Sequence, residues 1–172
     1  MISEPSAFTE ALDDLRAKAF TEAFDALRAK VGKEVHCSDW LQVTQARTDA
    51  FAAATGDHQW IHVDPERAAT ESPWKSTIAH GYLTLSLYPV LRGLVDERRP
   101  LFPGVQRVIN YGLDKLRFPN AVKAGSRVRA RCVLLRVESV AGGLQMAELF
   151  TLEVDGESKP ACVAEAIMRV YF

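Results

Sequence analysis

The sequence predicts an α+β fold in which an antiparallel sheet wraps around one buried helix, and three observations carry this prediction. Residues 78–95 are apolar on almost every side, which is typical of a helix that is buried all round. Four segments rich in β-branched and apolar residues follow it. Glycine-containing turns separate several of these segments, and strands joined by short turns pair in antiparallel fashion.

The N-terminal region predicts an amphipathic helix, or a pair of helices, that ends at Gly32. Apolar residues recur there at nearly helical spacing among charged ones: Phe8, Leu12, Leu15, Ala19, Phe20, Leu27 and Val31. We assign residues 1–32 to a helical extension and residues 33–172 to a single domain, because no interior linker is visible. The extension is expected to pack against the main body or a second subunit; a partner-binding helix is the alternative.

The next elements alternate between strand and helix. Residues 35–43 are predicted to form a strand, and Thr44 then offers an N-cap for a helix that Gly56 ends. A polar and aromatic loop, residues 57–63, follows. Asp64 and the proline after it predict the start of a short helix to about residue 71.

The central helix and the strands complete the predicted order. Pro89 lies inside the apolar segment 78–95 and should kink that helix. The strands are expected at residues 105–118, 127–137, 144–154 and 161–171. Residues 141–143 and 155–157 suit tight hairpins, so we expect the four strands to form a meander.

Composition excludes several classes of function. The chain has 21 Lys and Arg against 22 Asp and Glu, a net charge of −1, so it lacks the global basic field of a nucleic-acid-binding protein. Cys37, Cys132 and Cys162 form no CxxC pair, which argues against a disulfide framework or a zinc site. The apolar stretch 81–91 is shorter than the roughly 20 residues that span a bilayer. The N-terminus has no signal-peptide pattern, so we expect a soluble cytoplasmic protein.

Asp57 and His62 are the first candidates for catalysis. They are five residues apart on one loop, which can curl so that both side chains hold a single water. One group can take a proton from that water while the other delivers a proton to carbon, each transfer being worth about 10²- to 10⁴-fold in rate. The carboxylate is then expected in a dehydrated place, shielded by Trp60 and Ile61. Alternatively, Asp57 caps a backbone turn and His62 is a surface residue.

Gly81 is the next candidate, at the mouth of the predicted central helix. Its N–H could stabilise the oxygen of a thioester carbonyl as negative charge develops there, or the glycine could merely permit close packing. His80 beside it is expected to orient this turn or to bond a backbone carbonyl. His58 is expected at the surface, and Asp64 is expected to be a helix cap.

Three arginines alternate along one predicted strand, at Arg127, Arg129 and Arg131. A solvated strand face is the favoured interpretation, and a seat for the phosphates of coenzyme A is the alternative.

Residues 55–85 resemble the signature of the MaoC-like, or (R)-specific enoyl-CoA, hydratases, especially the branch related to nodulation protein N. The matching residues are Asp57, Ile61, His62, Asp64 and the run Ile78-Ala79-His80-Gly81-Tyr82. A second block, residues 109–112 with 116–119, is similar to another block of that branch. The resemblance covers roughly residues 35–171 and leaves the first helix outside.

This resemblance implies a hot-dog fold, usually a homodimer with active sites near the subunit interface. It implies hydration of a trans-2-enoyl thioester to the (R)-3-hydroxyacyl product, or the reverse. Asp57 and His62 would be the acid–base pair, and Gly81 would be the oxyanion donor. Coenzyme A or an acyl-carrier protein would carry the acyl group as part of the substrate, so no separate cofactor and no metal is expected.

A few positions depart from the family pattern. Gln59 and Trp60 replace the commoner Asn-Pro. Gln59 can still donate and accept hydrogen bonds at the substrate, whereas Trp60 is bulky enough to narrow the site. Pro89 stands where some of these hydratases carry a supporting serine, and Asn110 is a candidate replacement for it.

Two competing functions remain open. A thioesterase would also use a carboxylate and an oxyanion donor, but its water attacks the carbonyl carbon. The Asp57–His62 pair favours hydration over such hydrolysis. A non-catalytic acyl-thioester-binding protein could be built on the same fold, and the presence of both residues speaks against it.

Overall fold

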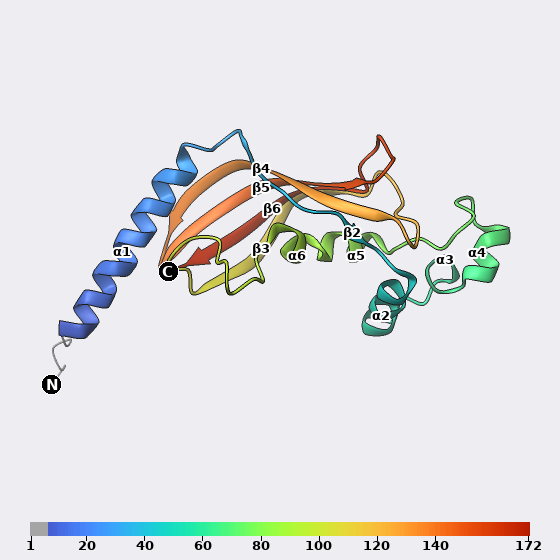
Figure 1. Ribbon diagram of the computed structural model, residues 1–172, viewed down its shortest axis with the longest axis horizontal. Helices are drawn as coiled ribbons and strands as arrows, with labels where there is room; N and C mark the ends of the chain where they lie inside the picture. Colours follow the sequence, from blue (N-terminus) through green and yellow to red (C-terminus); the bar gives the residue numbers. More distant parts are fainter. Residues whose placement is uncertain (1–6) are drawn as a thin grey trace.

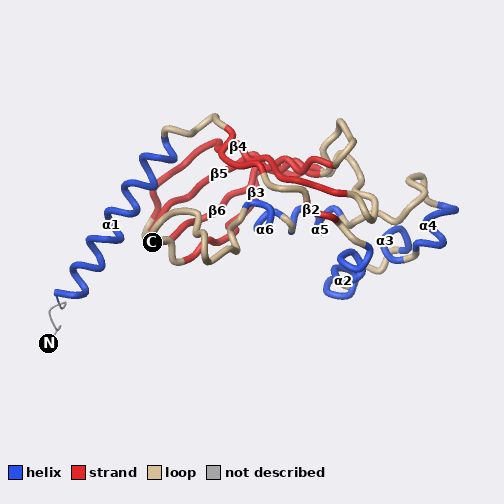
Figure 2. The backbone as a smooth tube through the Cα atoms, in the orientation of Figure 1, coloured by secondary structure: helices blue, strands red, loops and turns tan. Residues whose placement is uncertain are grey.

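The computed structural model describes residues 7–172, with side chains from residue 11 onward, as a curved sheet, a central helical segment and an N-terminal helix (Figures 1 and 2). The helices are α1 (Ala7–Arg28), α2 (Gln45–Thr55), α3 (Trp60–Val63), α4 (Pro65–Glu71), α5 (Gly81–Ser86) and α6 (Tyr88–Arg92). The strands are β1 (Glu34–Cys37), β2 (Leu41–Gln42), β3 (Arg107–Arg117), β4 (Arg127–Val140), β5 (Gly143–Val154) and β6 (Cys162–Tyr171).

The strands form one antiparallel sheet in the order β1-β4-β5-β6-β3, with β2 also paired to β4. Figure 1 shows this sheet passing over α5 and α6. Large side chains that the sheet and helices enclose form the core, among them Phe150, Leu134, Leu144 and Met146. The predicted α+β fold, a sheet around a central helical segment, is therefore confirmed.

The predicted meander of four strands is only partly right. β4 and β5 are joined by a tight turn in which Gly142 has a φ of 75°. Residues 155–161 join β5 to β6; this loop begins with a turn in which Gly156 has a φ of 79°, but it is longer than the tight hairpin predicted there. β3 pairs with β6 instead of β4. The segment 118–126 between β3 and β4 is not a tight hairpin, and it carries the chain from one edge of the sheet to the far side of β5.

The central helix is broken where a kink was predicted. α5 ends at Ser86, and α6 begins at Tyr88 with Pro89 in its first turn, where proline has no N–H to lose from the helix. The helical part is also shorter than residues 78–95, because Ile78 forms a β-bridge with Lys123 and Gly93 ends α6 in the left-handed conformation. Tyr82 is 66% exposed, so this segment is not buried on every side within one chain.

The strand predicted at residues 35–43 is interrupted. β1 and β2 both pair with β4, but between them the Ser38 side chain replaces a main-chain partner in the hydrogen bonding to β4. The Ala130 N–H donates to Ser38 Oγ at 2.9 Å, and the Ser38 N–H donates to the Ala130 carbonyl at 2.9 Å. The helix that follows begins and ends as predicted, with Thr44 Oγ1 accepting from the Arg47 N–H and Gly56 as its left-handed cap.

The C-terminal half of α1 packs on the body of its own chain. Ala23 and Leu27 are buried there, and Phe20 makes an edge-on contact with Phe172. The first turns extend beyond the sheet (Figure 1), and Leu15 remains 65% exposed. Among residues 7–172, none of the helices combines the length and apolar character needed to cross a bilayer.

A buried ion pair joins α6 to the sheet. Arg92 donates to both carboxylate oxygens of Glu148 on β5, with two contacts at 2.9 Å, and the Tyr88 hydroxyl donates to the same carboxylate at 2.9 Å. Glu148 is 0% exposed and Arg92 is 7% exposed. Burial, followed by the neighbouring Glu148, raises the pKa of Tyr88. The cluster fixes the second half of the central segment against β5.

Candidate active site

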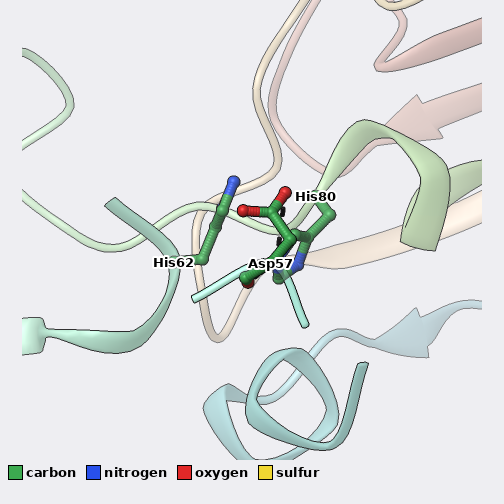
Figure 3. Close-up of side chains that lie close together, drawn as sticks. All are labelled: Asp57, His62 and His80. Carbon is green, nitrogen blue, oxygen red and sulfur yellow. Dashed lines mark hydrogen bonds and ion pairs between the residues drawn. The ribbon is translucent and has the colours of Figure 1, made fainter. Parts of the chain in front are cut away.

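Asp57, His62 and His80 come together at one end of the central segment (Figure 3). Asp57 lies on the loop after α2, His62 lies in α3, and His80 is the residue immediately before α5. The loop predicted at residues 57–63 thus contains a short helix, whose first turn is closed by the Gln59 carbonyl accepting from the His62 N–H. That turn directs His62 inward.

His62 is buried, 7% exposed, and oriented by the main chain. Its Nδ1 lies 2.7 Å from the Ile78 carbonyl, which can only accept, so Nδ1 carries the hydrogen and Nε2 keeps its lone pair. The pKa of His62 is lowered from its ordinary value, chiefly by burial, with His80 adding to the effect; the Ile78 bond and Asp57 act the other way. The ring is therefore suited to accept a proton near neutral pH.

Asp57 makes a turn contact, and it also faces the histidines of the cluster. Its Oδ1 accepts from the Gln59 N–H at 3.4 Å, as a turn cap would. Its other oxygen lies 3.9 Å from His80 Nε2. The side chain is 51% exposed, so the dehydrated setting expected for the carboxylate is not present within one chain.

The polar atoms of the acid–base candidates are spaced closely enough for one water to bridge them. Each of Asp57, His62 and His80 offers one oxygen or nitrogen atom, and these atoms all lie within 4.8 Å of one another. Two hydrogen bonds of about 2.8 Å that meet at one water span up to roughly 5 Å. The carboxylate and the imidazole therefore lie close together, and their joint action on one water stays a prediction.

Gly81 opens onto the same pocket as His62. The pocket has a volume of about 340 Å³, and its walls include Trp74, Thr84 and Phe118. Gly81 is the first residue of α5, so the helix makes no use of its N–H. A Cβ at this position would lie 2.8 Å from the Phe118 ring. The glycine is therefore needed for close packing, and the oxyanion role of its N–H stays a prediction.

The other residues singled out in the sequence lie around this centre or away from it. Gln59 and His58 are exposed, and Asp64 caps α4 by accepting from the Arg67 N–H. Asn110 lines a different pocket of about 380 Å³, formed by α5, α6, β3 and β6. Within one chain, the structure does not place Asn110 beside His62 and Gly81.

The three alternating arginines of β4 are engaged with acidic neighbours. Arg127 pairs with Asp155, Arg129 with Glu153, and Arg131 with Glu34 and Glu153. These acidic partners neutralise the positive charge of the arginines. The structure therefore favours the interpretation as a solvated strand face over a binding site for coenzyme A phosphates.

Phe118 is a site residue to which sequence reasoning gave no role. It follows β3, far along the chain from Asp57, and its ring covers Gly81 and meets Tyr82 edge-on. The available signal was the aromatic residue in the second block of resemblance, but only the three-dimensional packing shows what it covers.

The three clustered side chains are also the group best placed to hold a metal ion within the described residues. His62 and His80 are stacked, with ring centroids 3.7 Å apart and planes inclined by 26°. Stacked rings direct their lone pairs side by side instead of toward one centre, which is a poor arrangement for tetrahedral ligation.

The fold and this site define the chain as a hot-dog protein with a candidate acid–base centre at the mouth of its central helix. The MaoC like domain matches residues 26–152. An unliganded R-hydratase from Pseudomonas aeruginosa has a TM-score of 0.60 and 26% sequence identity to this chain, covering 82% of it and 81% of that chain.

Two curated relatives are similar over most of their length. The 3-hydroxyacyl-thioester dehydratase Z of Mycobacterium tuberculosis (strain ATCC 25618 / H37Rv) is 52% identical over 139 residues, which cover 80% of this chain and 89% of that protein. Nodulation protein N of Rhizobium leguminosarum bv. viciae is 42% identical over 149 residues, which cover 83% and 87%. The chain therefore belongs to the MaoC-like dehydratase family and is a hydro-lyase of the hydratase–dehydratase class.

Proposed function

We propose that this enzyme interconverts a trans-2-enoyl thioester and the (R)-3-hydroxyacyl thioester, with Asp57 and His62 acting on one water. The observation that carries the proposal is the shared pocket: His62 and Gly81 both line it, and the Asp57 carboxylate lies within 4.8 Å of a ring nitrogen of His62. The R-hydratase and the 3-hydroxyacyl-thioester dehydratase among the similar proteins support this substrate class and stereochemistry.

Hydration begins with a water held between the two side chains. Nε2 of His62 accepts one proton of the water, whose hydroxide adds to C3 of the enoyl group. Asp57 accepts a hydrogen bond from the same water, and its negative charge favours the imidazolium that forms. In this scheme His62 makes both proton transfers, whereas the sequence had suggested one transfer for each of the two groups. Electron density moves to the thioester oxygen, where the N–H of Gly81 donates a hydrogen bond.

The imidazolium of His62 then returns its proton to C2, which completes the 3-hydroxyacyl thioester. Dehydration runs the same steps backward: His62 removes the proton from C2 and passes it to the departing hydroxyl at C3. The pair thus ends each turnover in its starting protonation state, and one water is consumed or released.

The defining experiment follows enoyl absorbance with crotonyl-CoA and a longer-chain enoyl-CoA. We expect wild type to hydrate at least one of them, and Asp57→Asn and His62→Ala to lose turnover by about 10²-fold or more. His58→Ala, a histidine of the same loop, is the matched control and should remain fully active. Wild-type turnover in either site variant would reject the acid–base pair.

The same assay separates the competing functions. Release of free thiol from crotonyl-CoA would support a thioesterase. Binding without conversion of the thioester would support an acyl-thioester-binding protein. We prefer hydration because it requires a proton to be delivered to C2 after the water has been activated, and the imidazolium of His62 in the proposed pair can supply that proton.

We propose that catalysis uses no metal and no bound cofactor. The steps above need only side-chain groups, a main-chain N–H and water. Turnover should therefore survive dialysis against EDTA unchanged. A loss that added zinc or magnesium restores would contradict this proposal and would point to the cluster of Asp57, His62 and His80 as the metal site.

We further propose a homodimer built on the edge strand β3. Ile109, Tyr111 and Leu113 on this strand are 44%, 54% and 42% exposed, and an edge strand offers backbone groups for pairing with a second copy. Tyr82 packs edge-on against Phe118, the residue that follows β3, and we propose that the second copy covers Tyr82 and shields Asp57. The cytoplasmic location expected from the sequence remains a prediction.

A further inference from the structure

His80 is part of the cluster, yet the hydration step gives it no task. Its side chain is 4% exposed. Nε2 lies 2.9 Å from the main-chain oxygen of Asp57, and the ring stacks on that of His62 with centroids 3.7 Å apart. Figure 3 shows the three side chains drawn together from separate segments. One buried ring thus contacts both residues of the proposed acid–base pair.

The hydrogen-bond partners fix the tautomer and orientation of this ring. A carbonyl oxygen only accepts, so His80 Nε2 must carry the hydrogen. Nδ1 is buried and has no hydrogen-bond partner among the residues that the structure describes. The bond to Asp57, with His62 and Phe51 against the ring, therefore determines how the ring lies.

His80 is also joined directly to the third component of the site. It is the residue before Gly81, and its carbonyl accepts from the Thr84 N–H at 3.2 Å as the first bond of α5. Movement of the His80 main chain would move the start of α5 and the Gly81 N–H with it. Through one residue, the Asp57 turn, the His62 ring and Gly81 are held together.

We infer that His80 is a positioning residue. It holds the Asp57 turn and the His62 ring at fixed positions relative to the N–H of Gly81. This inference rests on the proposed function, and it deepens it by separating the groups that touch substrate from the group that places them. Displacement of a catalytic group by about 1 Å can cost about 10²-fold in rate, so a single buried contact is enough to matter.

Two substitutions separate the contacts that His80 makes. His80→Gln keeps a donor N–H the same number of bonds from Cα but loses the ring, whereas His80→Phe keeps a stacking ring but loses the donor. We expect His80→Phe to lower kcat by about 10- to 100-fold with KM changed by less than about threefold. His80→Gln should stay within about fivefold of wild type, because the bond to Asp57 is restored.

A measurement without substrate tests the contact itself. Nitrogen-15 NMR of the imidazole rings should show His80 protonated at Nε2 and unprotonated at Nδ1. The amide resonances of residues 57–59 should shift in His80→Phe and remain near their wild-type positions in His80→Gln. Melting temperatures of both variants check that the fold is retained, and His58→Phe is the control for loss of a histidine from this region.

The outcomes distinguish failure of this inference from failure of the proposed function. If Asp57→Asn abolishes turnover while His80→Phe turns over like wild type, the positioning role is wrong and the acid–base pair stands. Protonation of His80 at Nδ1 in the NMR spectrum would equally overturn it. If Asp57→Asn keeps full turnover, the proposed function fails whatever the His80 variants do. Adding His80→Phe to Asp57→Asn should cause a smaller further loss than His80→Phe causes in wild type, since part of the effect of His80 passes through Asp57.

Discussion

At the scale of single residues, the fall of kcat/KM at acid pH should reflect protonation of His62. Burial lowers the pKa of this ring from its ordinary value of 6.5. His62 must be unprotonated to accept a proton from water, so turnover is lost as the pH falls through that lowered pKa. We expect kcat/KM for hydration to stay constant from about pH 8 to 7 and to fall only below 6.5. A limb centred above that value would contradict the proposed role.

The sequence was informative about the residues that lie close together along the chain. Asp57 and His62 could be paired from their spacing, because a short loop restricts where two side chains can point. The stack of His80 on His62 depends instead on where α5 begins relative to α3, which no local pattern specifies. The solvent exposure of Asp57 could not be predicted either, since it depends on which distant segments cover the loop.

At the scale of elements, the buried pair between α6 and β5 should be costly to break. Glu148→Gln leaves the Arg92 guanidinium buried without its carboxylate partner, and loss of one member of such a pair costs about 3–5 kcal/mol. We expect the free energy of unfolding, measured by urea denaturation, to fall by about this amount.

Glu71→Gln is the matched control for that measurement. It removes the partner of Arg67 in the exposed i,i+4 pair of α4, which is worth about 0.5 kcal/mol or less. Equal losses in the two variants would mean that the α6–β5 pair does not behave as a buried one.

Element boundaries set by local chemistry were predicted well. Thr44, Gly56 and Asp64 cap helices as their types suggested, because a cap depends on a few adjacent residues. The interruption at Ser38 was not predicted, since a serine that replaces a main-chain partner depends on its register with β4. Pro89 marked the right place, but whether proline kinks a helix or begins a new one depends on the surrounding packing.

At the scale of the whole molecule, β3 is the surface that should decide the state of association. We expect wild type to be a dimer by size-exclusion chromatography with light scattering. The paired substitutions Ile109→Lys and Leu113→Lys should give a monomer, because they place charges along the edge. Leu15→Lys on the exposed part of α1 is the control and should stay dimeric. A monomer from Leu15→Lys alone would instead assign the contact to α1, which the sequence also suggested.

The overall arrangement was predictable only as far as short connections determine it. The hairpins joining β4, β5 and β6 could be located from their turn residues. The place of β3 beside β6 could not, because the link after β3 allows either edge and tertiary packing chooses between them.

That strand order has a consequence for how the protein is made. β3 pairs within the chain with β6 (Cys162–Tyr171), so during synthesis it has no partner strand until β6 has emerged from the ribosome. Until then its apolar side chains and both of its backbone edges are available to other nascent chains. The interval before β6 emerges is therefore when aggregation is most to be expected, and slower translation would prolong this interval instead of helping β3 to fold.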